Sequence, residues 1–409
     1  MKNAYDILKE RGFIEQTTDE TAIRRIFGQK KITAYIGFDP TAPSFHVGNL
    51  ASLMTMVHLQ KNGHKPIILF GGGTGLVGDP SGKDKVRPLL GLNKVKENAL
   101  SQKNQVSQII NLDKKQALFL NNADWLAKLN YIEFLREIGV HFSINRLLTA
   151  ESIKIRLKTG ISFLEFSYQL LQAYDFWYLF KKYDCVLQLG GSDQWGNIVA
   201  GIDLIRRKEQ KEAYGITIPL LTTASGKKMG KTETGAVWLD PKLTSPYEYY
   251  QYWINTDDRD VVKLLLIFTL LSVDEINKYK KLKGEKLRQA KEILAYEATK
   301  FIHGEEETQK AKDASSALFN KKAGGKGLVP TTTLKREEVK SGIPAYKLFV
   351  AAGLAKSNGE AQRLIKQGGA YLNEEKITEF NVLITESYFK NGEVLLRAGK
   401  KKYQRLKLN

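Results

Sequence analysis

The chain has 409 residues, of which 42% are hydrophobic and 26% are charged. Both fractions are near the averages of globular proteins, so bulk disorder is excluded and roughly two to four domains are expected. The formal charge of +19 favours a polyanionic partner over a merely solvated basic surface only where basic residues cluster. The single cysteine, Cys185, excludes an internal disulfide, and no Cys/His spacing predicts a zinc site.

Neither a targeting segment nor a membrane span is evident. The first residues, MKNAYDILKERGFIEQ, contain acids and lack the apolar core of a secretory signal. The most apolar stretch, 261–273, is interrupted by Lys263 and is shorter than the ~20 residues that a membrane helix needs. We therefore expect a cytoplasmic protein without membrane contact.

Short β-branched or aromatic runs alternate with helical patterns in the first two hundred residues. The runs are residues 32–38, 66–70, 116–120 and 185–189. This order predicts an α/β fold with a parallel sheet and crossover helices. Glycine clusters follow two of the runs, at 71–75 and 190–191. Open α/β sheets bind ligands at such strand ends.

The later part of the chain predicts two further regions. Between residues 284 and 304, apolar side chains recur in steps of three and four, which predicts a helix with one buried face. Residues 322–336 have the composition of a linker. The segment after it resembles a small folded module with a basic tail, because six basic residues and no acid follow from Arg397 onward. A nucleic-acid contact is expected there.

Two segments have the chemistry of phosphate binding. The run DPTAPSFHVGN, residues 39–49, precedes a helical pattern, and Gly48 lets an anion approach the first turn of that helix. Alone, so short a pattern is more often an ordinary helix start than a phosphate site, because short patterns recur often. The run GKKMGKT, residues 226–232, is a glycine-flanked lysine loop, which either follows charge on a leaving pyrophosphate or is a solvated turn. Together the two segments resemble the paired signature motifs of class I aminoacyl-tRNA synthetases.

Further blocks resemble the bacterial tyrosyl-tRNA synthetases, in that family's order. They are YIGFDPT (35–41), GLVGDPSGK (75–83), GISF (160–163), EFSY (165–168), LQAYDF (171–176) and GGSDQWGN (190–197). The resemblance covers essentially the whole chain. It implies a tyrosine–tRNA ligase that uses ATP to form tyrosyl-adenylate and then charges tRNA(Tyr).

The resemblance also implies the domain organisation. Residues 1–222 would form a Rossmann-like parallel-sheet catalytic domain with an insertion at about 124–160, and residues 223–321 the lysine loop and an α-helical domain on the anticodon side. A linker, 322–336, would lead to a small α+β S4-like RNA-binding domain, 337–409. The family further implies a homodimer, through the insertion.

The roles of the tyrosine-binding residues follow from the resemblance. Tyr35 and Asp175 would bind the phenolic hydroxyl, one donating and one accepting. Phenylalanine would leave this pair unsatisfied, and tyrosyl-tRNA synthetases are themselves the known example of such discrimination, about 10⁵, a value that belongs to the family. The ammonium group would be held by Asp79, Tyr168 and Gln172. Gln194 would lie near the carboxylate or the adenylate.

On the ATP side, the resemblance implies a larger set. The catalytic residues would be Thr41, His46, Asn49, Lys83, Arg87, Lys228, Lys231 and Thr232. The ATP-binding residues would be Gly37, Asp39, His46, Gly48, Gly191, Asp193 and Lys231. Mg²⁺ would be carried by the phosphates, with no protein metal site. His46 would donate a hydrogen bond rather than act as a base, because the attacking carboxylate is already ionised.

Some features depart from the family or admit other functions. Asn49 stands where many members have histidine, and Gly230 stands where many have serine. Arg363 and Lys366, three positions apart, would contact RNA phosphates, or else form a solvated helix face. The alternatives are a tryptophanyl-type synthetase, a small nucleotidyltransferase, or an inactive RNA-binding relative.

Overall fold

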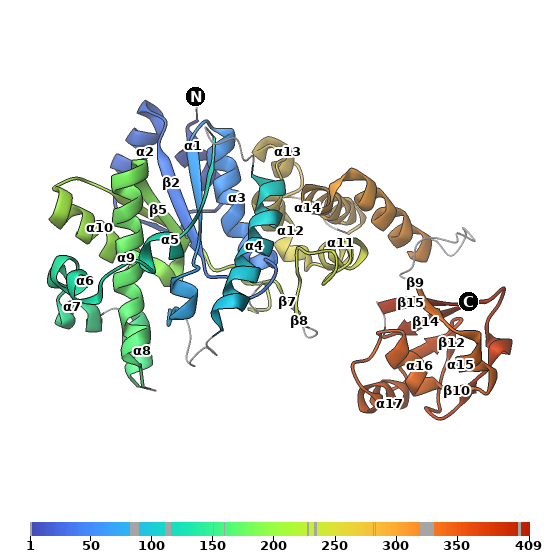
Figure 1. The fold of residues 1–409 in the computed structure, drawn as a ribbon. Helices are drawn as coiled ribbons and strands as arrows, with labels where there is room; N and C mark the ends of the chain where they lie inside the picture. Colours follow the sequence, from blue (N-terminus) through green and yellow to red (C-terminus); the bar gives the residue numbers. More distant parts are fainter. Residues whose placement is uncertain are drawn as a thin grey trace. The chain divides into compact units, whose positions relative to one another are not determined.

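The computed structural model describes residues 2–81, 90–110, 116–149, 151–158, 160–226, 229–232, 235–280, 282, 284–319, 331–399 and 402–409. The chain divides into two compact units, Met1–Glu305 and Glu306–Asn409 (Figure 1). The first is α/β with a largely parallel sheet and additional helices, and the second contains a small α+β module. The predicted fold class is therefore confirmed, whereas the finer boundaries near residues 222, 321 and 336 stay predictions.

A six-stranded sheet forms the centre of the first unit, in the order β1-β6-β5-β2-β3-β4. β1 pairs with β6 antiparallel, and the other neighbours run parallel. All four predicted strands are present, and β6 and β1 extend the sheet at one edge. The bounds are β1 Gln16–Thr17, β2 Thr33–Phe38, β3 Lys65–Phe70, β4 Leu118–Asn121, β5 Cys185–Gly191 and β6 Tyr214–Ile218.

Helices cover both faces of this sheet. In Figure 1, α9 and α10 lie on one face, and α1 and α3 lie on the other. Local sequence sets where these helices start, since His46 caps α3 and Ser162 forms a capping box with Glu165 at the start of α9. The bounds are α1 Ala4–Glu10, α2 Glu20–Gln29, α3 Val47–Lys61, α4 Leu92–Ile109, α9 Phe163–Tyr183 and α10 Trp195–Glu209.

Short helices fill the segment between β4 and α9, where the insertion is expected. Asn130 caps one of them, accepting hydrogen bonds from the amides of Ile132 and Glu133. Arg156 forms a buried ion pair with Glu165, 2.8 Å long, which ties the last of these helices to the start of α9. The bounds are α5 Ala123–Leu126, α6 Tyr131–Glu137, α7 Ile144–Thr149 and α8 Glu151–Leu157.

The helical part that follows packs through α12 against α3 and the end of α1. The Arg11 guanidinium donates to the carbonyls of Leu266 and Thr269, at 2.8 and 2.9 Å, and also to that of Leu271. It thereby caps the end of α12. The last helix is interrupted at Gly304, where φ is 80°. The bounds are β7 Lys231–Thr232, β8 Gly235–Ala236, α11 Pro246–Ile254, α12 Val261–Phe268, α13 Val273–Asn277 and α14 Glu285–Phe319.

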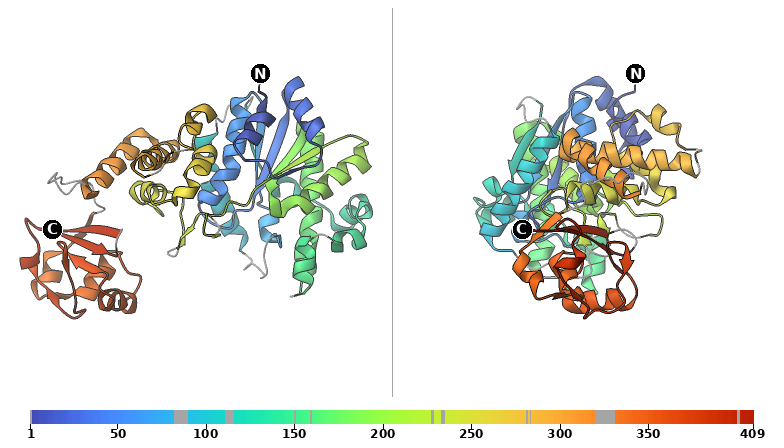
Figure 2. Two further views of the ribbon diagram at one scale, coloured as in Figure 1. Left: turned by 180° about the vertical axis from the view of Figure 1, so that it is seen from behind. Right: turned by 90° about the vertical axis from the view of Figure 1, so that its right-hand side faces the viewer.

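The second unit, whose C-terminal module is drawn in orange and red in Figure 2, contains a five-stranded sheet and a two-stranded β10–β13 pair. The order of the larger sheet is β12-β11-β14-β15-β9. The core of this unit includes Val339, Phe349 and Leu396. The strand bounds are β9 Thr331–Leu334, β10 Ile343–Pro344, β11 Ala370–Leu372, β12 Glu375–Lys376, β13 Leu383–Ile384, β14 Glu393–Ala398 and β15 Lys402–Leu408, and the helices are α15 Arg336–Lys340, α16 Ala345–Ala351 and α17 Asn358–Lys366.

The expected basic tail is not a tail. Its last residues form β15, which lies between β14 and β9. Leu406 and Leu408 are buried, whereas Arg405 and Lys407 approach Glu393 across the strand pair at 3.5 and 3.8 Å. The basic run therefore alternates apolar and charged residues as a strand does. Across the described part of the chain, no helix has the length and apolar character needed to cross a membrane.

Candidate active site

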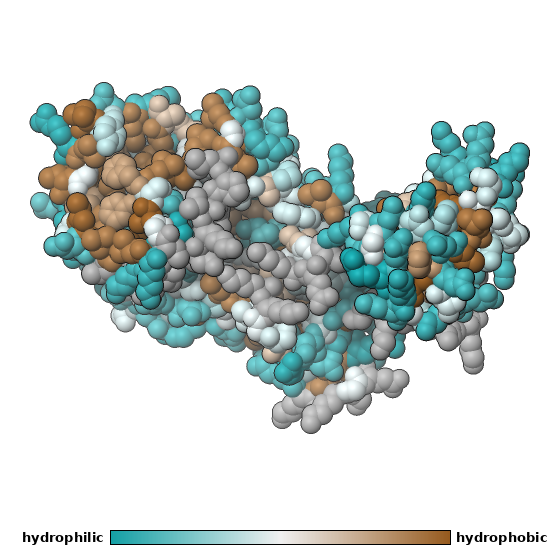
Figure 3. All heavy atoms as spheres, turned by 90° about the horizontal axis from the view of Figure 1, so that it is seen from below, coloured by the Kyte–Doolittle hydropathy of each residue, from teal (hydrophilic) through white to brown (hydrophobic). Residues whose placement is uncertain are grey.

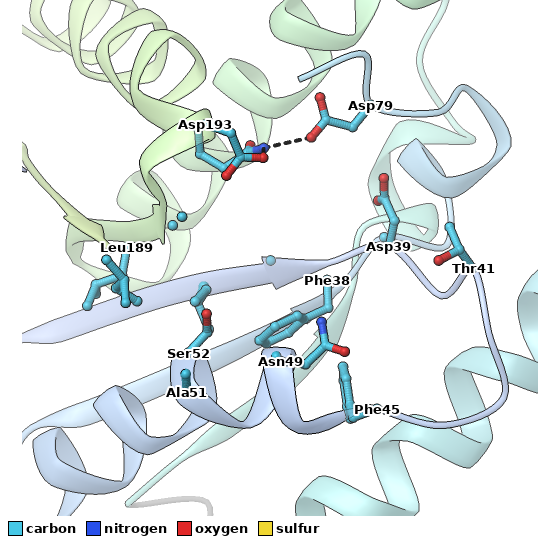
Figure 4. Close-up of a pocket in the computed structure, with 18 of the residues that line it drawn as sticks. Phe38, Asp39, Thr41, Phe45, Asn49, Ala51, Ser52, Asp79, Leu189 and Asp193 are labelled. Carbon is cyan, nitrogen blue, oxygen red and sulfur yellow. Dashed lines mark hydrogen bonds between the residues drawn. The ribbon is translucent and has the colours of Figure 1, made fainter. Parts of the chain in front are cut away.

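One cavity of about 660 Å³ opens at the carboxyl ends of β2 and β5. Figure 4 shows Asp39 and Thr41 directly after β2, Asp79 on the loop that follows β3, and Asn49 on the first turn of α3. The predicted site residues of the first unit whose side chains are described all line this cavity: Tyr35, Gly37, Asp39, Thr41, His46, Gly48, Asn49, Asp79, Tyr168, Gln172, Asp175, Gly191, Asp193 and Gln194.

The buried end of the cavity holds a tyrosine and an aspartate. Asp175, on α9, accepts hydrogen bonds from Trp125 Nε1 at 2.7 Å and from Asn122 Nδ2 at 2.8 Å. Burial nevertheless raises the pKa of Asp175 to about 7. The Tyr35 hydroxyl, from β2, is buried without a hydrogen-bond partner among the described residues. Burial also raises the pKa of Tyr35 well above its usual value, so this hydroxyl keeps its proton as a free donor.

A second cluster of polar side chains lies on α9, on the N-terminal side of Asp175. Asp175, Gln172 and Tyr168 share one helical face because they are three and four positions apart. Tyr168 donates its hydroxyl proton to Asp39 at 2.9 Å, and Gln172 Oε1 accepts from Asn197 at 2.9 Å. The phenolic oxygen of Tyr168 therefore offers only lone pairs to a further ligand.

Asp79 completes this cluster from the loop after β3. It accepts from Gln194 Nε2 at 2.7 Å and from the amide of Ser81 at 2.9 Å. Burial raises the pKa of Asp79, while these hydrogen bonds oppose the rise. A carboxylate and neutral acceptors together suit an ammonium group.

The first turn of α3 forms the opposite wall. His46 Nδ1 accepts from the amide of Asn49 at 3.3 Å, and Asn49 Oδ1 accepts from the amide of His46 at 3.1 Å. The neutral imidazole then carries its proton on Nε2 as a donor. A Cβ on Gly48 would lie 2.9 Å from the His46 ring, so glycine keeps this turn open. The arrangement suits an anion at a helix N-terminus.

The lysine loop meets this turn through its backbone. Just after the loop, the carbonyl of Val237 accepts from the amide of Val47 at 3.0 Å, and Trp238 forms an antiparallel β-bridge with His46. A Cβ on Gly230 would lie 2.7 Å from the Gly48 amide, and φ at Gly230 is 78°, so this position requires glycine for two reasons. The two predicted phosphate segments are thus in contact.

Several predicted residues cannot be placed in this geometry. Lys83, Arg87 and Lys228 lie outside the described residues, and so do the side chains of Lys231 and Thr232, whose backbone forms β7. In the second unit, Arg363 and Lys366 are both exposed on α17, with Ala361 and Ile365 buried on the other side. They share an exposed helical face, as expected, and their role stays a prediction.

The sequence interpretation missed three polar residues that organise the buried end. They are Asn122 and Trp125, which donate to Asp175, and Thr74, which donates to Asp39 at 2.7 Å. Asn122 and Trp125 fall after the strand at 118–121, so strand-end position was the available signal. Their side-chain directions depend on long-range packing that no local pattern encodes.

Comparison with known proteins agrees with this geometry. The family model described as tRNA synthetases class I (W and Y) matches residues 28–320, and the one described as the tyrosine–tRNA ligase SYY-like C-terminal domain matches residues 323–406. The chain therefore belongs to the class I tRNA synthetases of the tryptophan and tyrosine family, on its tyrosyl, bacterial-type branch.

The assignment to the tyrosyl, bacterial-type branch rests on similarity over the full length of the chain. A tyrosine–tRNA ligase of Clostridium botulinum is 53% identical over 99% of both chains, and that of Clostridium kluyveri is 52% identical over the same share. A truncated mitochondrial tyrosyl-tRNA synthetase of Aspergillus nidulans superposes with a TM-score of 0.71 and 32% identity, covering 78% of this chain and 95% of its own. These similarities confirm the predicted family.

Proposed function

We propose that the protein activates L-tyrosine with ATP, releases pyrophosphate, and transfers the tyrosyl group to the terminal ribose of tRNA(Tyr). The observation that carries this is one cavity that joins a buried phenol-sized end, at Tyr35 and Asp175, to a helix N-terminus suited to phosphate. Membership of the tyrosyl-tRNA synthetase family supports the same reaction.

Hydrogen-bond polarity favours tyrosine as the amino acid. Asp175 as a carboxylate only accepts, so the substrate phenol would donate to it. The free proton of Tyr35 would then satisfy the phenol oxygen. Phenylalanine would leave both groups unsatisfied in a buried place, and that is costly. Tryptophan has no hydroxyl for this pair.

The ammonium and carboxylate of the substrate would extend toward the strand ends. Asp79, Tyr168 and Gln172 would hold the ammonium, and the oxygen of Tyr168 is suited to it because its own proton is given to Asp39. Gln194, bonded to Asp79, would orient the carboxylate or adenylate. Asp193 and Gly191 would bind the ribose and adenine.

The chemistry would rest on position and charge rather than on proton removal. The tyrosine carboxylate would attack the α-phosphorus in line as the bond to pyrophosphate breaks. His46 Nε2, with Thr41, Asn49 and the amides of α3, would stabilise the phosphates. Lys83, Arg87, Lys228, Lys231 and Thr232 would add counter-charge, and Gly37, Asp39 and Gly48 would shape the ATP seat.

Magnesium would enter with ATP. No group of three or more His, Cys, Asp or Glu side chains among the described residues is arranged to hold a metal ion. Oxygen atoms of the phosphates are ligands that Mg²⁺ prefers, and it commonly keeps several waters. We therefore infer an ion carried on the nucleotide, which would neutralise phosphate charge.

We also infer a homodimer that forms through the insertion. Large apolar side chains are exposed together there, among them Ile132 (62%), Val140 (70%), Ile144 (64%) and Phe163 (69%). Ile144 and Phe163 also line an apolar hollow of about 450 Å³, to which α6, α7 and α9 contribute side chains, and Figure 3 shows the apolar area at the left. Such a patch usually marks an interface. We call these four residues the insertion patch.

Two further parts of the proposal concern tRNA and location. Arg363 and Lys366 of the SYY-like domain would contact tRNA phosphates, and the exposed positions of both side chains support this. A cytoplasmic location is proposed because charging of tRNA belongs to protein synthesis, and the single cysteine suits a reducing compartment.

Pyrophosphate exchange into ATP, without tRNA, tests the first step. Tyrosine, phenylalanine and tryptophan are offered separately to the purified full chain. Exchange with tyrosine alone is expected. Exchange with tryptophan would assign the other branch of the family, and no exchange with any of them would point to an inactive RNA-binding relative.

A further inference from the structure

Thr74 lies between the two ends of the proposed tyrosine site. It is buried in the short helix Thr74–Leu76 and lines the cavity. Its hydroxyl is 2.7 Å from Asp39 Oδ1 and 2.9 Å from Asn122 Nδ2. Asn122 in turn reaches Asp175, while Asp39 receives Tyr168. One hydroxyl thus connects the phenol end to the ammonium end.

The direction of each hydrogen bond in this chain is fixed. The amide of Gly73 donates to Asn122 Oδ1 at 2.7 Å, so the NH₂ group of Asn122 must face Thr74 and Asp175. Asn122 therefore spends both of its protons, one on each partner. Thr74 accepts one of them, and its single proton goes to Asp39.

We propose that Thr74 is a positioning residue that sets the polarity of both ends of the tyrosine site at once. Because Thr74 accepts one N–H of Asn122, the other N–H of Asn122 stays on Asp175. This hydrogen bond holds Asp175 as a carboxylate that can accept from the phenol. Because Thr74 also donates to Asp39, it holds the carboxylate that accepts the proton of Tyr168. The phenolic oxygen of Tyr168 is then left to accept from the ammonium. This inference rests on the proposed function and deepens it.

Replacement by valine isolates the hydroxyl. Thr74→Val keeps the side-chain shape but removes two buried hydrogen bonds, the one that Thr74 accepts from Asn122 and the one that it donates to Asp39. Both ends are then free to reorient. Thr74→Ser restores the hydroxyl. Thr299→Val is the matched control, because Thr299 is fully buried and its hydroxyl has no hydrogen-bond partner among the described residues.

The experiment measures tyrosine-dependent pyrophosphate exchange and two inhibition constants in the full-length variants. Phenylalanine probes the ammonium end without the hydroxyl, and 3-(4-hydroxyphenyl)propionate probes the phenol end without the ammonium. Thr74→Val is expected to raise the KM for tyrosine about tenfold, or about 1.4 kcal/mol, with a smaller change in kcat. It should weaken both inhibitors, while Thr74→Ser and Thr299→Val stay close to the parent.

Three results would overturn the role of Thr74: parental constants in Thr74→Val, an equal loss in Thr74→Ser, or weakening of only one of the two inhibitors. The last would mean a local packing defect at one end. Failure of the proposed function looks different, because the parent protein itself would then show no exchange with tyrosine. Calorimetric titration of the same three ligands would still decide the role of Thr74 in that case.

Discussion

At the residue scale, Asp175 makes tyrosine binding sensitive to pH near neutrality. Its pKa is raised to about 7 by burial, and the hydrogen bonds from Asn122 and Trp125 limit the rise. The phenol needs the ionised form as an acceptor, so tyrosine affinity should fall as pH falls through about 7. Trp125→Phe removes one donor, raises the pKa further, and should move this loss to higher pH. Calorimetric titration across neutrality measures it.

The control for this prediction is Trp177→Phe. The Trp177 indole donates to Glu209 at 2.7 Å, away from Asp175. The pH profile of tyrosine binding by the Trp177→Phe variant should therefore match that of the parent protein. A profile for Trp125→Phe that does not move would mean that another group governs the pH dependence.

At the element scale, the N-terminus of α3 combines a structural and a chemical role in His46. His46→Asn retains a good N-cap but loses the Nε2 donor. We expect an unchanged melting temperature, an unchanged KM for tyrosine, and a fall in the exchange rate of about 10²-fold, as for the loss of one transition-state donor. A parallel rise in the KM for tyrosine would place His46 in amino-acid binding instead.

The contact between α1 and the end of α12 makes a second prediction at this scale. Arg11→Ala removes the donor from the buried carbonyl of Thr269 and the partly buried carbonyl of Leu266, so it should lower the free energy of unfolding by roughly 2–4 kcal/mol. Arg25→Ala, on exposed α2 surface, is the control and should change it little. Chemical denaturation measures both. Equal stability of the two variants would contradict the capping role.

At the scale of the whole molecule, the insertion patch predicts self-association. Ile144→Asp combined with Phe163→Asp places charge in the proposed interface, so sedimentation should show a monomer where the parent protein sediments as a dimer. Leu100→Asp is the matched control, since Leu100 is 62% exposed on α4, outside the patch. A monomeric parent protein would refute the dimer.

The order of the elements was predictable because it is written locally. Runs of β-branched residues, with glycine clusters after two of them, predicted the parallel strands, and the segment 39–49 predicted the start of α3. Most residues that line the cavity were predicted from the resemblance of their motifs to those of the tyrosyl-tRNA synthetases. What the sequence did not yield is the network of Thr74, Asn122 and Trp125, because each partner lies far away in the chain. The strand β15 was missed because its charges masked the alternation of Leu406 and Leu408.

The place of β15 has a consequence for synthesis on the ribosome. Among the strands that the structure describes, β9 pairs only with β15, in parallel. β9 leaves the ribosome first, and its partner comes only with residues 402–408. Until then the edges of β9 and β14 are unpaired, and such edges invite association with other chains. A ribosome that stops before Lys402 would release a module without β15, in which β9 and β14 lack their shared partner. Such truncated products should therefore aggregate rather than retain partial RNA binding.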